Sequence, residues 1–426
     1  MVQKFRSLFF VLLFCLAGEF SVHAQAQAKV CDPDAFGAKA DGVTKDTRAI
    51  QAAIDSCASA GGGTVRLGKG VYLSAPLVLK SNITLEVAKG ATLKGSPDHR
   101  DYPETMVFRA KGMQSLVSTA DAHDIAITGG GVIDGNGASW WTDASGKRPN
   151  SILGVGVFRP RLIVFDHSRH IRIEDVTVQN SPSWQIVPYY SDDVVIRNIK
   201  VLAPANSPNT DAIDPFASSN VVIDHVYADV GDDNVAIKSG AINSPGPDSP
   251  AKNITITDCI FDHGHGLSIG SELAGGAQNI HAERIRFTGT DQGIRIKANR
   301  DRGADVSNLS FKDIRMTGVK TAILITEYYP DTPPDGDNPP KPVTRLTPFF
   351  HDIRIENLKA AGGDTAGVIF GLPESPVKDV VLKNVDIAAA KGMVISDAIV
   401  TLSGLHVQAG QGRELDIRRS AKVSGK

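Results

Sequence analysis

Most of the chain repeats a short unit in which one polar residue precedes aliphatic side chains at alternate positions. Each unit begins with Asn, Asp or His, and its first copy reads Asn-Ile-Thr-Leu at positions 82–85. Later copies begin at Asp124, His170, Asp193, Asn220, Asn253, Asn279, Asn308, Asp352 and Asp379. Alternation with a period of two is typical of a strand that buries one face. The pattern therefore predicts one β-strand per unit.

The spacing of the units indicates how these strands are arranged. From position 170 onwards the intervals are 23, 27, 33, 26, 29, 44 and 27 residues, and the two earlier intervals of 42 and 46 predict two coils each. A leucine-rich repeat would show a Leu and Asn framework with a helix per turn. A sandwich would space its strands by about 8–12 residues. The spacing favours an all-β fold, a right-handed single-stranded parallel β-helix.

A solenoid of this kind needs its open ends covered, and the sequence offers one short capping helix. Residues 46–58 place four side chains on one face at helical spacing: Ile50, Ala53, Ile54 and Cys57. Asp46 or Thr47 is expected to begin this helix, and the glycine run 61–63 to end it.

Two further segments stand out from the repeats. The stretch from Tyr329 to Pro348 is rich in Pro and Asp and predicts a loop that reaches over one face. Residues 410–426 are basic and small, and predict a loose tail. No linker is visible, so residues 25–426 are expected to form one domain.

The first residues have the pattern of a signal peptide, expected to span 1–24. Lys4 and Arg6 precede an apolar run over 8–16, and a small-residue cleavage site follows at 22–24, ending at Ala24. The run is too short to span a membrane, and no later stretch is long enough. The pattern predicts a secreted or periplasmic protein, cleaved near Ala24 and not anchored in a membrane afterwards.

Export would permit disulfide bonds, and the cysteines allow one. Cys31 and Cys57 flank a single N-terminal unit, and the sequence leaves both the bonded and the free state open. Cys259 lies in a strand pattern, where a buried thiol acting as a small hydrophobe is expected.

Four polar clusters, about one repeat apart, interrupt the pattern between positions 209 and 297. They read Asn209-Thr210-Asp211, Gly231-Asp232-Asp233, Gly264-His265-Gly266 and Arg295-Ile296-Lys297. In a stacked-coil fold, side chains one repeat apart meet in space, so we expect one polar patch. The net charge of -2 argues against a nucleic-acid partner. No Cys/His spacing suggests zinc, and no Walker lysine suggests a phosphate loop.

The carboxylates carry the candidate chemistry. Asp211 precedes Asp232 by 21 residues, which places the two on adjacent coils about 4.7–4.9 Å apart. Two carboxylates at such a short distance repel each other, so at least one is expected to have a raised pKa or a cationic partner. Because consecutive strand residues point to opposite faces, Asp232 and Asp233 can both face outward only at a bend, which Gly231 permits. Two carboxyl groups of different protonation are what glycoside hydrolysis requires.

The other two clusters would support these acids. His265, between two glycines, is placed to tune one carboxyl group. Arg295 and Lys297 are two residues apart in a strand pattern and therefore face the same side. They would either neutralise the aspartates or bind an anionic substrate, and the sequence leaves both readings open.

In this order and spacing, the clusters resemble glycoside hydrolase family 28, the polygalacturonases. The matching text is NTDAIDP at 209–215, GDDNVAIKSG at 231–240, GHGLSIGS at 264–271 and GIRIK at 293–297. The resemblance extends over roughly residues 30–405 and includes GGGVIDGNG at 129–137. Ala212 is a departure, since the family commonly has Gly after this Asp.

The resemblance implies inverting hydrolysis of α-1,4 galacturonosyl bonds of pectin on a parallel β-helix, with no cofactor and no metal. Asp232 would be the general acid, Asp211 and Asp233 would activate the water, and His265 would keep the acid in its working state. Four residues would bind substrate: Asn209, Arg295, Lys297 and, by a looser match, Tyr328.

The implied partner is a polysaccharide, namely pectin, polygalacturonate or oligogalacturonides, bound by a monomer. Endo attack is favoured over exo attack. Exo action would require loops that close one end of the cleft. One alternative is a calcium-dependent lyase on the same scaffold, in which the Asp pair would hold the ion. Another is a non-catalytic β-helix adhesin or carbohydrate-binding protein, which would have no need for three carboxylates in one region.

Overall fold

The computed structural model describes Met1 and residues 29–145, 158–334, 336 and 338–425. Apart from Met1, the segment predicted to be a signal peptide lies outside the described residues, and its assignment stays a prediction. No helix in the described ranges is long and apolar enough to cross a membrane.

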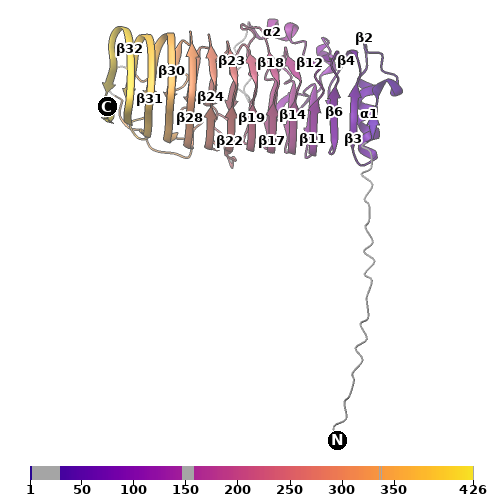
Figure 1. Ribbon diagram of the computed structural model, residues 1–426, viewed down its shortest axis with the longest axis horizontal. Helices are drawn as coiled ribbons and strands as arrows, with labels where there is room; N and C mark the ends of the chain where they lie inside the picture. Colours follow the sequence, from indigo (N-terminus) through magenta and orange to yellow (C-terminus); the bar gives the residue numbers. More distant parts are fainter. Residues whose placement is uncertain (2–28, 146–157, 335, 337, 426) are drawn as a thin grey trace.

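Parallel strands stack along one axis to form a right-handed parallel β-helix (Figure 1). The strands form three ladders, one for each side of the coil. The first is β1 (Val30–Cys31), β3 (Gly63–Leu67), β6 (Ile83–Val87), β11 (His123–Thr128), β14 (Arg169–Glu174), β17 (Asp192–Arg197), β19 (Ser219–Asp224), β22 (Ala251–Thr257) and β25 (Ala277–Glu283). The second is β2 (Asp41–Lys45), β4 (Gly70–Ser74), β7 (Ala91–Gly95), β12 (Val132–Asp134), β15 (Thr177–Gln179), β18 (Lys200–Leu202), β20 (Tyr227–Asp229), β23 (Ile260–Asp262) and β26 (Arg286–Thr288). The third is β5 (Leu77–Val78), β10 (Val117–Ala120), β13 (Ile163–Asp166), β16 (Ile186–Tyr189), β21 (Val235–Ile237), β24 (Leu267–Gly270), β27 (Gln292–Lys297) and β29 (Thr321–Thr326).

Longer strands at the C-terminal end run through more than one ladder. They are β28 (Asp305–Thr317), β30 (Phe349–Phe370), β31 (Val377–Ser396) and β32 (Ala398–Arg418), and β33 (Lys422–Gly425) pairs with β32. The prediction of a loose tail over 410–426 is therefore wrong for the described residues, which extend to 425. Leu415 pairs with Met393 and packs on the core, so the end of β32 completes a coil despite its basic composition.

The backbone explains why each repeat begins with Asn, Asp or His. All ten residues that begin the repeats have a positive φ, between 52° and 64°. This left-handed conformation is costly for most side chains and is adopted most readily, after glycine, by Asn, Asp and His. Three amides also form a ladder: Asn253, Asn279 and Asn308 each donate to the Asn one coil before, at 2.8–3.0 Å.

Aliphatic side chains fill the interior in columns along the axis. One column on the first ladder runs through Ile173, Ile196, Ile223 and Ile256, which pair in register and are all fully buried. Burial of this kind stabilises each side chain by about 1.5–3 kcal/mol, so the core is the main stabilising element of every coil.

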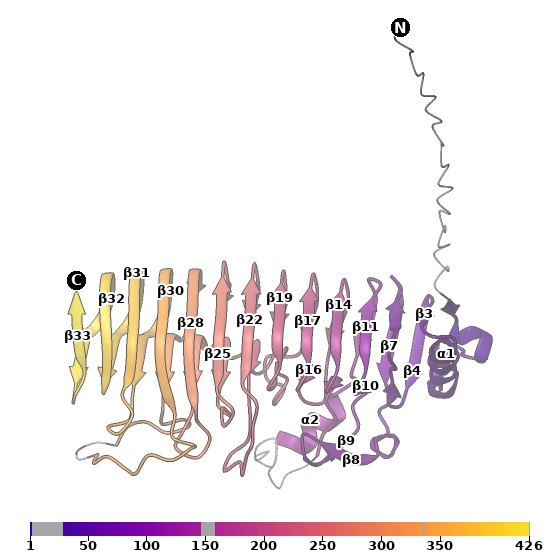
Figure 2. The same cartoon turned by 90° about the horizontal axis from the view of Figure 1, so that it is seen from below.

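The two early intervals, predicted to span two coils each, span one coil each. Ala126 of β11 pairs with Thr84 of β6, and Ile125 pairs with Ile171 of β14, with no strand between them in this ladder. The extra residues form insertions instead. The first holds η2 (His99–Asp101) and an antiparallel hairpin of β8 (Glu104–Val107) and β9 (Ala110–Met113), and the second holds α2 (Ala138–Ser145). Figure 2 shows these insertions on one side of the coils, together with the loop after β29.

The N-terminal end is covered as expected. Helix α1 (Thr47–Ser59) follows the 3-10 turn η1 (Pro33–Phe36) and lies over the first coils. The Asp46 carboxylate, directly before α1, accepts from the backbone N–H groups of Lys39 and Ala40 at 2.7 and 3.0 Å, rather than from the helix. Cys57 is bonded to Cys31, with Cα atoms 6.0 Å apart.

Candidate active site

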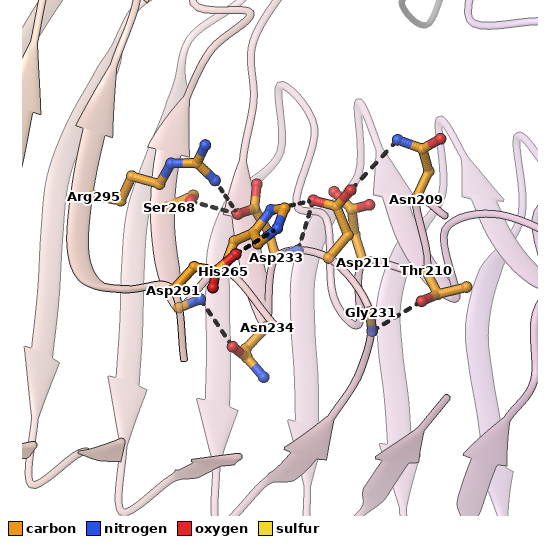
Figure 3. A network of polar contacts seen from close by, with 12 residues as sticks. Asn209, Thr210, Asp211, Gly231, Asp233, Asn234, His265, Ser268, Asp291 and Arg295 are labelled. Atoms are coloured by element: carbon orange, nitrogen blue, oxygen red, sulfur yellow. Dashed lines mark hydrogen bonds and ion pairs between the residues drawn. The ribbon is translucent and has the colours of Figure 1, made fainter. Parts of the chain in front are cut away.

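The register of the third ladder brings the four polar clusters together. The Ala212 N–H donates to the Asp233 carbonyl at 2.9 Å, so Asp211 lies on the coil next to the Asp pair. Pairing of Val235 with Leu267 places His265 on the following coil. Arg295, which pairs with Ser268, lies one coil further on. Figure 3 shows residues of these clusters converging on one outward-facing patch.

A bend before β21 allows both members of the Asp pair to contribute to this patch. The backbone N–H of Asp233 donates to Oδ1 of Asp232 at 2.9 Å, which fixes the two carboxylates relative to each other. Glycines on the next coil make room for that bend. A side chain on Gly264 would place its Cβ 2.3 Å from the carbonyl oxygen of Asp232, and both Gly264 and Gly266 have φ near +80°.

Asp233 is held as an anion by two cations. Its Oδ1 accepts from Arg295 Nη1 at 2.9 Å and from Ser268 Oγ at 2.8 Å, and its Oδ2 accepts from Lys297 Nζ at 3.0 Å. Burial alone would raise the pKa of Asp233. The charges of Lys297 and Arg295 outweigh it and hold the pKa well below its usual range.

Asp232 is the most exposed of the three aspartates, with a side chain that is 20% exposed. Its Oδ1 lies 3.1 Å from Nδ1 of His265, and its Oδ2 accepts from the Asn209 amide at 3.4 Å. Burial opposes ionisation of Asp232, but the adjacent His265 prevails and lowers its pKa. His265 also approaches Asp291, at 3.3 Å. Burial disfavours the imidazolium, yet the pKa of His265 is raised because Asp232 stabilises the charged form.

Among the three aspartates singled out from the sequence, Asp211 is the one whose pKa is raised. It is 3% exposed, its Oδ1 has no hydrogen-bond partner among the described residues, and its Oδ2 lies 3.9 Å from Lys238 Nζ. Burial, followed by the charge of Asp232, raises the pKa of Asp211 well above its usual range. The patch therefore combines a carboxyl group whose pKa is raised with one that has cationic partners, on adjacent coils, as the spacing predicted.

The same groups have the geometry of a possible cation site, which bears on the calcium alternative. One ligand atom each from Asp232, Asp233 and His265 lie within 4.8 Å of one another. Arg295 and Lys297 already neutralise Asp233, however, and a divalent ion beside them would meet two positive charges. The donor set therefore does not fit calcium well.

Several residues of the patch were not singled out from the sequence. Lys238 lies 3.4 Å from Glu272 and close to Asp211, and the opposing charges raise its pKa despite burial. Asp214 is fully buried, neither of its oxygens has a partner among the described residues, and burial raises its pKa well above its usual range. Lys238 follows Ile237 and Lys297 follows Ile296, and both isoleucines pair with Ile269, so the period that located Lys297 also contained this signal.

Tyr328 was expected at the substrate site, but the tyrosine beside Arg295 and Lys297 is Tyr329. The ring of Tyr329 lies 5.3 Å from the Arg295 guanidinium and 5.0 Å from Lys297 Nζ. Tyr328 is buried in the adjoining pocket, where its hydroxyl accepts from Asn338 at 2.6 Å and its ring lies below Arg300. Consecutive side chains diverge, so only one of the two reaches the patch.

A parallel β-helix with an outward patch of coupled carboxyl groups is the arrangement of a polysaccharide hydrolase, and comparisons agree. Residues 57–404 match the model of glycosyl hydrolases family 28. A probable polygalacturonase of Vitis vinifera is 31% identical over 390 residues, 87% of this chain and 77% of that protein. An endo-polygalacturonase of Pectobacterium carotovorum subsp. carotovorum is 30% identical over 410 residues, 90% of this chain and 96% of that protein.

A solved structure extends the likeness to three dimensions. The hyperthermoactive exopolygalacturonase of Thermotoga maritima has 28% identity and a TM-score of 0.73, with 94% of this chain and 93% of that one covered. The chain therefore belongs to glycoside hydrolase family 28. Its activity is that of a glycoside hydrolase.

The charge balance around His265 is testable by titration. Replacing Asp232 by Asn removes the anion that stabilises the imidazolium, so the pKa of His265 should fall, because burial then dominates. NMR titration of the imidazole signals in wild type and Asp232→Asn measures this shift. His406, whose pKa is raised by its pairing with Asp386 at 3.0 Å, is the internal control and should keep the same pKa in the variant. An unchanged pKa for His265 would contradict the pairing.

Proposed function

We propose that this chain is an exported, monomeric polygalacturonase that hydrolyses α-1,4 galacturonosyl bonds of pectin or polygalacturonate with inversion. The observation that carries the proposal is the geometry of the patch: Asp211, Asp232 and Asp233 lie on adjacent coils, and Asp233 is paired with Arg295 at 2.9 Å and with Lys297 at 3.0 Å. The family match and polygalacturonase relatives support the substrate class. The signal-like pattern at 1–24 supports export.

Asp232 is assigned as the general acid because it is the most exposed of the three carboxyl groups and lies within reach of a bound sugar. Asp211 and Asp233 activate the water. In the free site the pKa of Asp211 is raised and that of Asp232 is lowered, so the acid role requires a proton transfer to Asp232 as substrate binds. An entering sugar carboxylate favours that transfer, because added negative charge raises the pKa of Asp232.

The reaction class is tested by metal removal and product analysis. Because aspartates supply both acid and base, cleavage of polygalacturonate should survive EDTA and give products without the ultraviolet absorbance of an unsaturated uronate. NMR of the first product should show inverted anomeric configuration, whereas retained configuration would contradict the proposed mechanism. EDTA-sensitive cleavage with rising absorbance would favour the lyase, and an absence of any cleavage would favour the binding protein.

The acid role is tested with leaving groups of different quality. Asp232→Asn should lower kcat on polygalacturonate by about 10²–10⁴-fold, the usual loss of general acid catalysis, with an almost unchanged Tm. An aryl galacturonide with an acidic phenol as leaving group needs little protonation, so on it the loss should be much smaller. Asp211→Asn, the matched variant, should lose activity on both substrates. If the two variants exchange these behaviours, the acid and base assignments are reversed.

The cations are tested with substrate charge. A charge-assisted hydrogen bond contributes about 1.5–3 kcal/mol, so Lys297→Met should lower kcat/KM on polygalacturonate at least about tenfold. The loss on fully methyl-esterified pectin should be smaller, because that polymer offers no carboxylate. Lys297 also contacts Asp233, so some loss on both substrates is expected. Equal losses would mean that Lys297 serves only Asp233.

A further inference from the structure

The β8–β9 hairpin does not project into solvent but lies against the outward face of the third ladder. Its tip consists of Phe108 and Arg109, both with positive φ, and Phe108 is only 4% exposed. We call residues 104–113 the end hairpin. In Figure 2 the hairpin lies below the coils, on the side of the other insertions.

Phe108 packs into an aromatic cluster on that face. Its ring centroid lies 4.2 Å from that of Tyr189, 5.4 Å from Phe216 and 6.1 Å from Trp184. The Arg161 guanidinium stacks on the Phe108 ring at 4.2 Å. The hairpin tip therefore covers the outward surface of β16 and of the coil after it.

That covered coil is the one that bears the first carboxylate of the site. Asp211 and Phe216 belong to the same coil. That coil forms isolated β-bridges to β16 on one side and to residues 235 and 238 on the other. Asp232 and Asp233 lie on the next coil, about 4.7–4.9 Å away. The hairpin tip thus packs on the coil that bears Asp211, on the N-terminal side of the Asp pair.

Arg109 continues the cover to the opposite edge of the ladder. It stacks on Tyr190 at 4.9 Å, donates to the Pro247 carbonyl at 3.3 Å and lies 3.9 Å from Asp248. Asp248 belongs to the loop that follows β21, and its side chain is only 5% exposed. The end hairpin thus precedes β10 in the chain and reaches the loop after β21 that contains Asp248.

The loop that receives Arg109 is itself fixed on its other side. Asp248 accepts from Ser244 Oγ at 2.6 Å and lies 3.5 Å from Arg345, which belongs to the insertion between Tyr329 and Pro348. Arg345 also donates to the Ala274 carbonyl at 3.3 Å and to the Ser244 carbonyl. One buried carboxylate therefore joins two insertions that are far apart in sequence.

We propose that the end hairpin closes one end of the substrate cleft, and that the enzyme therefore removes short fragments of fixed length from a chain end. This exo attack replaces the endo attack favoured by the sequence, and the inference rests on the proposed polygalacturonase function. Internal cleavage requires polymer to extend past the reacting bond in both directions. Here the extension toward β16 meets Phe108, Trp184 and Phe216.

The primary experiment follows product lengths over the first minutes of polygalacturonate digestion. Wild type should release one short product, a monomer or dimer, while the polymer loses viscosity slowly. Mid-length oligomers at early times would overturn the closed-end proposal and leave the polygalacturonase function intact. Failure to cleave at all would overturn the function itself, so the two failures are distinguishable.

Opening the cleft should change the product pattern. Glu104 and Met113 are cross-strand partners, so residues 105–112 can be replaced by an Asn-Gly turn that joins them. This variant should produce mid-length oligomers that wild type does not release, and Asp248→Asn should do so to a smaller extent. Met106→Ala, at a hairpin side chain that is 63% exposed, is the matched control and should leave products unchanged. A folded deletion variant with wild-type products would overturn the role of the hairpin.

Discussion

Hydrogen bonding between successive coils is the constraint on which this molecule depends. Once parallel strands pair in register, a side chain is fixed about 4.7–4.9 Å from its counterpart on the next coil. This spacing brings Asp211, the Asp232–Asp233 pair and His265 together although they are far apart in sequence. It also aligns aliphatic columns inside, so the scaffold that positions the acids is held by burial rather than by the polar patch.

Within that scaffold, charge compensation decides which carboxyl group is ionised. Burial alone would raise the pKa of each of the three aspartates. Their pKa values differ because the charged partners of each carboxyl group differ. Asp233 is paired with two cations and Asp232 with one imidazole, whereas Lys238 lies 3.9 Å from Asp211. A single patch therefore holds carboxyl groups whose pKa values are shifted in opposite directions, which acid and base catalysis needs.

Much of this could be predicted from the sequence, because the repeat has a backbone cause. Asn, Asp or His recurs where φ is positive, and the alternating aliphatics follow it, so both strand positions and the cluster register were readable. The fold class, the capping helix and the bend at the Asp pair were found in this way. The disulfide between Cys31 and Cys57, which the sequence left open, depended on a distance between two elements that no local pattern contains.

Other features could not be predicted, for related reasons. Interval length does not distinguish an extra coil from an insertion, so the intervals of 42 and 46 residues were assigned one coil too many. The basic composition of residues 410–426 suggested a loose tail, so the pairing of Leu415 with Met393 was not predicted. The choice between Tyr328 and Tyr329 depends on side-chain direction after the strand has ended, where the period of two no longer applies.

The insertions have a consequence for how such a protein can change during evolution. Residues added between two strands leave the pairing of β6, β11 and β14 unaltered, so a coil can lengthen without moving any catalytic side chain. Chemistry and polymer access are therefore encoded in separate parts of the chain. Selection can reshape where along a polysaccharide the enzyme cuts by lengthening or trimming surface segments, while the bond-breaking apparatus stays as it is.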